Sequence, residues 1–260
     1  MKPKTQQGKS LQKFNLIAGS VHLVQALILF AIANRELTMP VITRFLDQTA
    51  SGKIMPVSET LFNMPVALAG PLFLLLSAIF HFIIASPFYV RKYEQSIQKG
   101  INTLRWWEYS LSSSIMLVVL LMLGGLVELP SVVFIFALNF IMNMMGLVME
   151  KYNQLTEKTE WLPFNIGVFS GIVPWIVGGT YFWVSMSNIA DAIPSYAKIG
   201  FIITFILFNT FAINMWLQYK KVGKWKKYVY GEKAYIVLSL VAKTLLAWIL
   251  VLGTLNQVNQ

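Results

Sequence analysis

Lys243 is the residue of this chain whose position most needs a chemical explanation. It lies in an apolar stretch, nine residues after Ala234 and twelve before Leu255. At 1.5 Å of rise per helical residue, its Cα lies about 13 Å from one end of the stretch and about 18 Å from the other. A free ammonium group is costly at that depth, and a buried lysine is a better nucleophile because it ionises less readily. Lys243 therefore needs a partner, either a carboxylate or a carbonyl compound bound to it covalently.

The carboxylate that best suits Lys243 is Glu108, since few other titratable groups remain inside the apolar stretches once the connections are assigned. Glu108 is seven residues into the third stretch, about 10 Å past Ile101. The third and seventh stretches run in the same direction through a bundle, so the two side chains lie at similar depth and can pair. Two other interpretations stay open: a purely structural ion pair, and a Glu108 that faces a neighbouring helix while Lys243 extends towards the interface.

A further group of polar residues is expected at a similar depth. His22 and Gln25 are one turn apart in the first stretch, and Ser77 and His81 are one turn apart in the second. Asn102 lies at the start of the third stretch, on the same side. Polar groups inside lipid need partners or water, so these residues form either a satisfied polar cluster or a proton-accepting cavity. Two histidines without a third ligand do not predict a metal site.

The stretches that carry these residues are long enough to cross a membrane. The chain has 260 residues, of which 56% are hydrophobic and 12% charged, and it has no cysteine. This composition excludes disulfides and thiolate chemistry and indicates an integral membrane protein. We predict an all-α bundle of seven transmembrane helices in a single domain over 1–260. The expected spans are 13–34, 60–90, 101–126, 129–150, 161–187, 195–219 and 234–256.

The first span is similar to a signal peptide, because lysines precede an apolar run that ends in Ala31-Ile32-Ala33. The run is longer than the apolar part of a typical signal peptide, and it contains His22 and Gln25. We therefore predict that it is retained as the first helix.

Lysine and arginine residues lie in alternate connections, and this pattern predicts the orientation of the chain. Apart from Lys243, those on one side are Lys2, Lys4, Lys9, Lys13, Arg91, Lys92, Lys99, Arg105, Lys151, Lys158, Lys220, Lys221, Lys224, Lys226, Lys227 and Lys233. Those on the other side are Arg35, Arg44, Lys53 and Lys198. The positive-inside rule places the N-terminus in the cytoplasm and the C-terminus outside, in a multi-pass protein of the cell membrane. The net charge of +10 thus reflects topology, and no nucleic-acid partner is expected.

Two connections have features of their own. In the first, 35–59, β-prone runs at 41–46 and 54–57 flank a Ser51-Gly52 turn, which predicts a β-hairpin lying on the protein or on a second subunit; the alternative is a flexible loop. The sixth connection, 220–233, is basic with interleaved aromatic residues. It either faces lipid headgroups and enforces topology or docks an acidic cytoplasmic partner. The sequence contains neither hydrolase motifs nor a glycine-rich phosphate loop, and we do not expect an enzyme.

Several segments together resemble the heliorhodopsins, over essentially the whole chain. They are Phe14-Asn15 with Ile17-Ala18-Gly19, Arg105, Trp107-Glu108-Tyr109-Ser110-Leu111-Ser112-Ser113-Ser114, Leu162-Pro163-Phe164, Gly171-Ile172-Val173-Pro174-Trp175-Ile176, and Gly231-Glu232 with Ala234 to Lys243. In the microbial rhodopsins a lysine of the seventh helix binds retinal, and a carboxylate of the third helix is its counterion. The inverted orientation predicted above is typical of the heliorhodopsins among them.

The resemblance implies a role for each matching residue. Lys243 would bind all-trans retinal as a protonated Schiff base with Glu108 as its single counterion, because Ser239 stands where ion-pumping relatives carry a second carboxylate. The residues that would surround the polyene and its ring are Tyr109, Ser112, Ser113, Met142, Gly146, Gly171, Pro174, Trp175 and Phe208. The polar cytoplasmic cavity would comprise His22, Gln25, Ser77, His81, Asn102 and Arg105. The hairpin would form the contact of a homodimer in the lipid bilayer.

These expectations favour a slow light sensor without ion pumping. A protonated imine in a dry site needs a nearby anion, and isomerisation by light weakens that ion pair. The proton then passes by way of Glu108 to the cavity of His22 and His81. The residue eleven positions beyond Glu108 is Val119, and no acid follows Lys243 in the last span, so the outer half is an apolar barrier to ions. The alternatives are a light-gated ion or proton channel and a light-dependent regulator of a cytoplasmic enzyme, which requires an unknown signalling partner.

Overall fold

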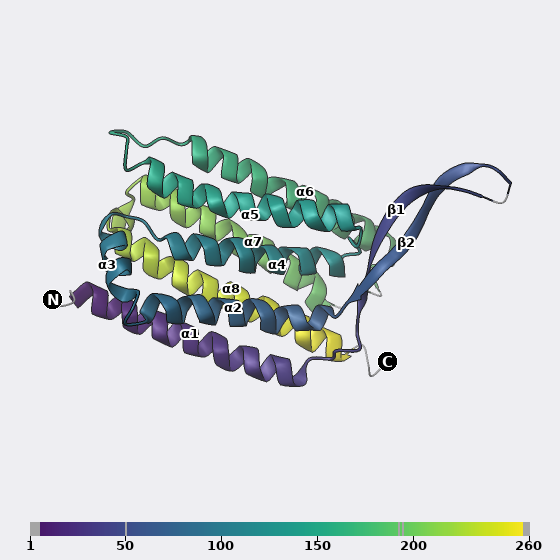
Figure 1. Cartoon of the computed structure of the whole chain (residues 1–260), viewed down its shortest axis with the longest axis horizontal. Helices are drawn as coiled ribbons and strands as arrows, with labels where there is room; N and C mark the ends of the chain where they lie inside the picture. Colours follow the sequence, from purple (N-terminus) through teal and green to yellow (C-terminus); the bar gives the residue numbers. More distant parts are fainter. Residues whose placement is uncertain (1–5, 50, 192, 194, 257–260) are drawn as a thin grey trace.

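The computed structural model describes residues 6–49, 51–191, 193 and 195–256. Within these residues, seven helices are long and apolar enough to cross a membrane, which confirms the predicted fold class. They are α1 (Gln6–Ile32), α2 (Ala69–Ala85), α4 (Thr103–Leu123), α5 (Leu129–Tyr152), α6 (Leu162–Ile189), α7 (Ser195–Tyr219) and α8 (Tyr228–Asn256). They lie side by side in one bundle, and α1 begins at the end opposite to the one where α8 finishes (Figure 1). Lys2 and Lys4, which contributed to the predicted orientation, lie outside the described residues.

The two ends of the bundle differ in the segments that cover them (Figure 1). One end carries the start of α1, the short helix α3 (Val90–Gln98), and the connections 153–161 and 220–227. We call it the lysine-rich end, because most of the lysines counted above lie there. The other end, which we call the hairpin end, carries the strands β1 (Met39–Gln48) and β2 (Ile54–Met64).

The second span differs from its predicted range of 60–90 at both ends. Its first predicted residues belong to β2, and the 3-10 turn η1 (Val66–Leu68) lies between the strand and α2. α2 ends at Ala85 because Ser86 precedes Pro87, which disfavours helical backbone, and Ser86 is extended with ψ 152°.

The first and last spans extend further towards the lysine-rich end than predicted. α1 begins at Gln6 instead of 13, and α8 begins at Tyr228 instead of 234. The second change matters most for the site, because it places Glu232 inside a helix of the bundle. The other four spans begin and end within three residues of the predicted positions.

The helix α3 was not predicted. Its buried residues are Val90, Tyr93 and Ile97, which share one face at helical spacing. With this face α3 packs on the lysine-rich end against Leu11 of α1 and Ile84 of α2. Helix α3 therefore lies across the end of the bundle, with one tyrosine directed inward.

β1 and β2 form the predicted antiparallel hairpin, with strands longer than expected. The hairpin projects beyond the bundle (Figure 1). Its base is attached to the start of α5, because Ile42 N donates to Val127 O at 3.0 Å and Arg44 pairs with Glu128 at 3.0 Å. Its exposed apolar side chains are those of Phe45, Leu46, Ile54, Met55, Leu61 and Phe62. Such a surface suits contact with a second apolar surface.

The half of the bundle nearer the hairpin contains the largest buried apolar group. Its members, here called the apolar core, are Ala26, Leu29, Val41, Phe73, Leu74, Met116, Leu117, Val118, Leu120, Leu121, Met122, Leu126, Ile135, Leu246, Ala247 and Val251. On every helix that contributes to it, the buried charged and histidine side chains of that helix lie nearer the lysine-rich end. The described residues thus divide into a polar half and an apolar half.

Candidate functional site

Lys243 and Glu108 form an ion pair inside the bundle, so the predicted pairing is present. The Ser77 hydroxyl bridges the two groups: Lys243 Nζ donates to Ser77 Oγ at 2.7 Å, and Ser77 Oγ donates to Glu108 Oε1 at 2.6 Å. Lys243 and Glu108 are each 3% exposed, and Ser77 is fully buried. α8, α4 and α2 each supply one of these residues. A cation and an anion are thus held away from water, where each needs the other.

Tyr109 covers one side of the pair. The Lys243 Nζ lies 5.1 Å from the centre of the Tyr109 ring, within the range of a cation–π contact. The Tyr109 hydroxyl donates to the carbonyl of Tyr235 at 2.8 Å, and Phe211 packs edge-on against the same ring. These contacts fix the ring plane beside the amine.

A narrow pocket extends from Lys243 between α4, α5 and α7. Its lining includes Ser113, Met142 and Phe208, three residues that the sequence had assigned to the retinal site, together with Tyr109. Sequence reasoning missed Asn143, which also lines the pocket and donates from Nδ2 to Ser113 Oγ at 3.1 Å. An asparagine inside a span was a signal that it had a buried partner.

The remaining predicted ring-end residues lie on α5 and α6. A β-carbon at Gly146 would collide with the ring of Trp106, and one at Gly171 would collide with the sulfur of Met142. Pro174 is buried in α6. The Trp175 ring packs edge-on against Phe208, with ring centroids 5.5 Å apart. Glycine at these two positions leaves room for the large side chains of Trp106 and Met142, of which Met142 lines the pocket.

Two hydroxyl groups near the ion pair have no hydrogen-bond partner among the described residues, those of Ser112 and Ser239. Ser112 is one turn from Glu108, and Ser239 is one turn from Lys243. An amine balanced by one carboxylate, unpartnered hydroxyls and an aromatic-lined pocket fit an elongated apolar carbonyl compound attached to Lys243. The site residues are therefore compatible with retinal.

His81 lies beside the ion pair, as predicted. A narrow polar pocket is lined by His81, Asn102, Arg105 and Glu108. The ring of His22 stacks on that of His81, with centroids 5.6 Å apart and planes at 16°. Within the described part of the chain, both nitrogens of His22 are without a hydrogen-bond partner. Three members of the predicted cavity, His81, Asn102 and Arg105, therefore line one pocket with Glu108, and His22 adjoins it.

Gln25 lies apart from that pocket. Its Oε1 accepts a hydrogen bond from Trp248 Nε1 of α8 at 2.9 Å, towards the apolar core. The His81 side chain instead contacts a residue that sequence reasoning missed, Asn15, through Nδ1 and Oδ1 at 2.8 Å. Asn15 could have been found from the sequence, because it lies in the first span on the same helical face as His22.

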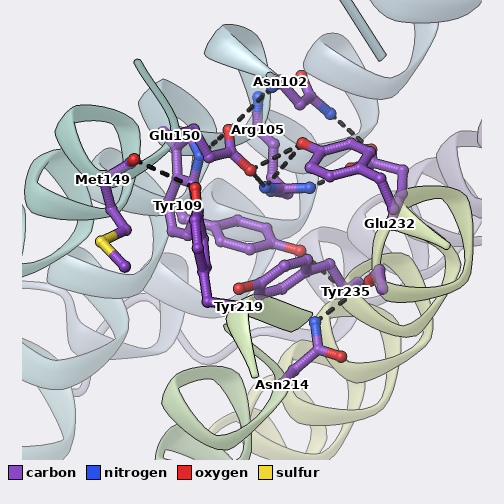
Figure 2. A network of polar contacts seen from close by, with 12 residues as sticks. Asn102, Arg105, Tyr109, Met149, Glu150, Asn214, Tyr219, Glu232 and Tyr235 are labelled. Atoms are coloured by element: carbon purple, nitrogen blue, oxygen red, sulfur yellow. Dashed lines mark hydrogen bonds and ion pairs between the residues drawn. The ribbon is translucent and has the colours of Figure 1, made fainter. Parts of the chain in front are cut away.

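A second buried ionic cluster lies nearer the lysine-rich end (Figure 2). Arg105 of α4 pairs with both Glu150 of α5 and Glu232 of α8. Arg105 is 4% exposed and each glutamate 1%. This corrects the expectation that few titratable groups besides Glu108 and Lys243 lie inside the helices. Glu150 was the last residue of the predicted span 129–150 and Glu232 lay in the connection 220–233, so neither was expected deep inside the bundle.

Neutral donors complete this cluster, which we call the arginine triad. Asn102 N and Trp106 Nε1 donate to Glu150 Oε2 at 2.9 and 2.6 Å, and Tyr228 OH donates to Glu150 Oε1 at 2.7 Å. Asn102 Nδ2 donates to Glu232 Oε1 at 2.6 Å. Since every carboxylate oxygen accepts a hydrogen bond, the arrangement suits two ionised carboxylates.

Tyr93 of α3 connects the arginine triad to the histidine side of the pocket. Its hydroxyl donates to Glu232 Oε1 at 3.0 Å. Burial and the nearby charge of Glu232 raise the pKa of Tyr93 well above its usual value, while a hydrogen bond with Asn15 opposes the shift. His81, Asn15, Tyr93 and Glu232 thus form a continuous series of polar contacts from the site to the surface helix.

No group of three or more histidine, aspartate or glutamate side chains able to hold a metal ion occurs among the residues that the structure describes. The side chains that the structure brings together at the site are an amine, a neighbouring carboxylate and a connected set of proton-bearing groups.

Comparison with known proteins identifies the family. The sequence model of the family described as Heliorhodopsin matches residues 11–255 of the 260-residue chain. No curated protein matches the chain. The matched residues include most or all of each of the seven spans and both residues of the buried ion pair. The chain therefore belongs to the heliorhodopsin family, whose members are retinal-binding, light-sensing rhodopsins.

Proposed function

We propose that the protein is a light sensor in which all-trans retinal is attached covalently to Lys243 Nζ, with Glu108 as the only counterion. The observation that carries the proposal is the buried contact of Lys243 with Glu108 and Ser77 at the end of an aromatic-lined pocket. The bound retinal supplies light absorption and a change of polyene shape. The residues of the chain hold a proton at Nζ and determine where it goes.

Glu108 and Ser77 hold that proton in the dark. Glu108 Oε1 stabilises a positive charge on Nζ, and Ser77 Oγ contacts both atoms and can relay a proton between them. Ser239 carries no negative charge, so Glu108 alone balances the positive charge on Nζ. Movement of Nζ away from Oε1 would remove the main interaction that keeps the nitrogen charged.

His81 is the proposed proton acceptor. Asn15 Nδ2 donates to the carbonyl of Leu11 at 2.9 Å, so its amide oxygen is the atom that faces His81 Nδ1. Nδ1 then carries the hydrogen, and Nε2 has the lone pair that accepts a proton. The stacked ring of His22 can share the added charge, whereas the position of Gln25 beside Trp248 argues against a role in this step.

The apolar core supports the proposal that the protein does not pump ions. A pump needs proton-bearing groups on both sides of the retinal nitrogen, and the positions beyond Glu108 and Lys243 are filled by residues such as Leu117, Leu121 and Leu246. The same observation weighs against a channel. We expect no photocurrent when the protein is illuminated in a voltage-clamped membrane, and a sustained current would favour the channel instead.

Three further proposals concern the orientation in the membrane, a homodimer and a signalling partner. The lysine-rich end is proposed to face the cytoplasm by the positive-inside rule. The exposed apolar side chains of the hairpin support its use in a homodimer. A cytoplasmic signalling partner, including an enzyme regulated by light, would bind at the lysine-rich end, where Tyr93 connects the site to α3.

The test is a visible absorption spectrum of the whole protein after addition of all-trans retinal. The wild type should develop a visible band, and Lys243→Ala should develop none. Glu108→Gln should bind retinal but shift the band, since the charge on the nitrogen loses its counterion. Lys198→Ala, which removes a lysine outside the site, serves as the matched control. A visible band in Lys243→Ala equal to that of the wild type would overturn the proposal.

A further inference from the structure

A groove separates α7 and α8 at the lysine-rich end, away from the Lys243 site. It has a volume of about 470 Å³. Ile213 and Leu217 of α7 face Val237 and Leu238 of α8 across it. Ile213 and Val237 are 54% and 46% exposed, although all four residues lie within the membrane-spanning parts of their helices. The apolar part of the groove is therefore open to the hydrocarbon region of the bilayer.

The rim of the groove is built from aromatic and amide side chains. Trp225 and Tyr230 pack edge-on, with ring centroids 4.9 Å apart. Trp225 Nε1 donates to Asn214 Oδ1 at 2.7 Å, and Asn214 Nδ2 donates to the carbonyl of Gly231 at 3.2 Å. Tryptophan and tyrosine favour the level of lipid headgroups. These hydrogen bonds hold the rim of the groove in a fixed shape at that level.

The charge above the groove is entirely positive. Lys233 lines the groove itself, with its Nζ 3.2 Å from Ser10 Oγ. The connection 220–227, which contributes Trp225 to the groove, carries Lys220, Lys221, Lys224, Lys226 and Lys227 and no acidic residue. The adjacent Glu232 is buried and pairs with Arg105, so it does not offset these lysines at the surface.

We propose that this groove binds one anionic phospholipid from the leaflet at the lysine-rich end. One acyl chain would lie along the apolar floor, and the phosphate would sit at the rim beside Lys233. An acidic protein segment could contact the lysines of the connection, but it would leave the apolar floor at membrane depth uncovered. The combination of a cationic rim and an apolar floor is complementary to a lipid of negative charge.

The groove lies where such a lipid would act on the site through α8. Asn214 and Gly231 join α7 to α8 one residue from Glu232, and Leu238 precedes Ser239. A lipid seated in the groove would hold α7 and α8 together at the position where α8 enters the arginine triad. It would therefore stabilise residues 230–238 of α8, which precede Lys243 on the same helix.

The experiment uses the whole protein in nanodiscs of pure phosphatidylcholine and of an equal mixture of phosphatidylcholine and phosphatidylglycerol. Native mass spectrometry after release from the discs measures the retained phosphatidylglycerol, and the unfolding temperature is measured in both discs. The wild type should retain one phosphatidylglycerol and unfold at a higher temperature in the mixed discs. Lys233→Gln should lower the retention about fivefold, the effect of one lysine near an anionic surface.

Two further variants separate the groove from general surface charge. Lys158→Gln removes a lysine of the connection between α5 and α6 at the same end, and it should retain lipid as the wild type does. Val237→Trp fills the apolar floor without changing any charge, and it should also lose the lipid. Retention by Lys233→Gln equal to that of Lys158→Gln, or retention by Val237→Trp equal to wild type, would overturn the proposal. So would equal retention of phosphatidylcholine by the wild type, or binding of polyglutamate without retention of phosphatidylglycerol.

Discussion

Two buried ionic clusters lie in the polar half of the bundle, and they differ in the cation at their centre. The Lys243–Glu108 pair has one bridging hydroxyl and two neighbouring hydroxyls that find no partner in the described part of the chain. The arginine triad has a guanidinium between two carboxylates whose oxygens all accept hydrogen bonds. A lysine can lose its proton or react with a carbonyl group, whereas an arginine in a protein stays charged. The Lys243–Glu108 pair can thus change its protonation or react, whereas the arginine triad keeps the charge of its arginine.

The difference also appears in what each cluster connects. The arginine triad joins α4, α5 and α8 and reaches α3 through Tyr93. It fixes the lysine-rich end of the helices that carry Glu108 and Lys243. The arginine triad therefore holds these helices in place while the protonation or bonding of Lys243 changes.

The largest effect is expected from Arg105→Gln. Removal of the guanidinium leaves two buried carboxylates without a counter-charge, which destabilises a fold by about 3–5 kcal/mol. The measurement is the unfolding temperature in detergent, followed by circular dichroism. Arg44→Gln is the matched control, since the Arg44 side chain is 64% exposed in its pair with Glu128, and it should cost no more than about 1 kcal/mol. Equal losses for the two variants would contradict the distinction between a buried triad and a surface pair.

A smaller effect is expected when one member of the changeable pair is removed. In protein without retinal, Lys243→Met leaves Glu108 able to take up a proton, so the loss should be about 1–3 kcal/mol. The double variant Lys243→Met/Glu108→Gln should regain part of that stability, because no lone charge remains. Unfolding temperatures of the two single variants and the double variant form a complete cycle. Strict additivity of the two single losses would show that the pair is not coupled.

Tyr93→Phe tests the link between the arginine triad and α3. Loss of the hydrogen bond to Glu232 should cost about 1–2 kcal/mol. The raised pKa of Tyr93 adds a pH dependence: its folded pKa exceeds the unfolded value of about 10, so this contribution is full below that pH and is lost at higher pH. Tyr93→Phe should therefore lose less stability than the wild type between neutral and strongly alkaline pH. Tyr89→Phe is the comparison: burial also raises the pKa of Tyr89, but this residue is only partly buried, and Tyr93 is the one that donates to Glu232, so the effect of Tyr89→Phe on stability and on its pH dependence should be smaller.

The smallest effect is expected from Ser239→Ala, compared with Ser77→Ala. The Ser239 hydroxyl has no partner among the described residues, so its loss should change the unfolding free energy by less than about 0.5 kcal/mol. Ser77 bridges the ion pair, and its loss should cost about 1 kcal/mol or more. The measurement is again the unfolding temperature. A larger loss for Ser239→Ala would mean that its hydroxyl has a partner in solution.

The bundle and the Lys243–Glu108 pair could be predicted from the sequence for a simple reason. Apolar length determines a span, and the two residues have depths that follow from counting along their own helices. Both inferences use local information. The roles of Lys243 and Glu108 towards retinal stay predictions, as do those of the other site residues.

The arginine triad could not be predicted in the same way. A hydropathy window ends where charges begin, so Glu150 and Glu232 fell at the edges of spans. What allows them inside is their contact with Arg105, which is 45 residues from Glu150 and 127 from Glu232 in sequence. Such compensation becomes visible only when three helices are placed together.

Gln25 illustrates a limit of helical spacing. Residues three apart lie on the same side of a helix but differ in direction by about 60° and in depth by about 4.5 Å. This difference is enough for His22 to face His81 on α2 while Gln25 faces Trp248 on α8. Spacing identified the polar face of α1 but not which neighbour each residue meets.

The apolar core has an electrical consequence. A membrane voltage falls mainly across the part of the protein with the lowest dielectric constant, which we expect here to be the hairpin half, because the apolar core lies there. The polar half, including Lys243 and His81, then lies close to the potential of the solution at the lysine-rich end. A full crossing of the membrane changes the energy of a proton by about 2.3 kcal/mol per 100 mV, but a proton moving between these two residues would cross only a small part of that field. We therefore expect its transfer rate to be nearly independent of membrane voltage.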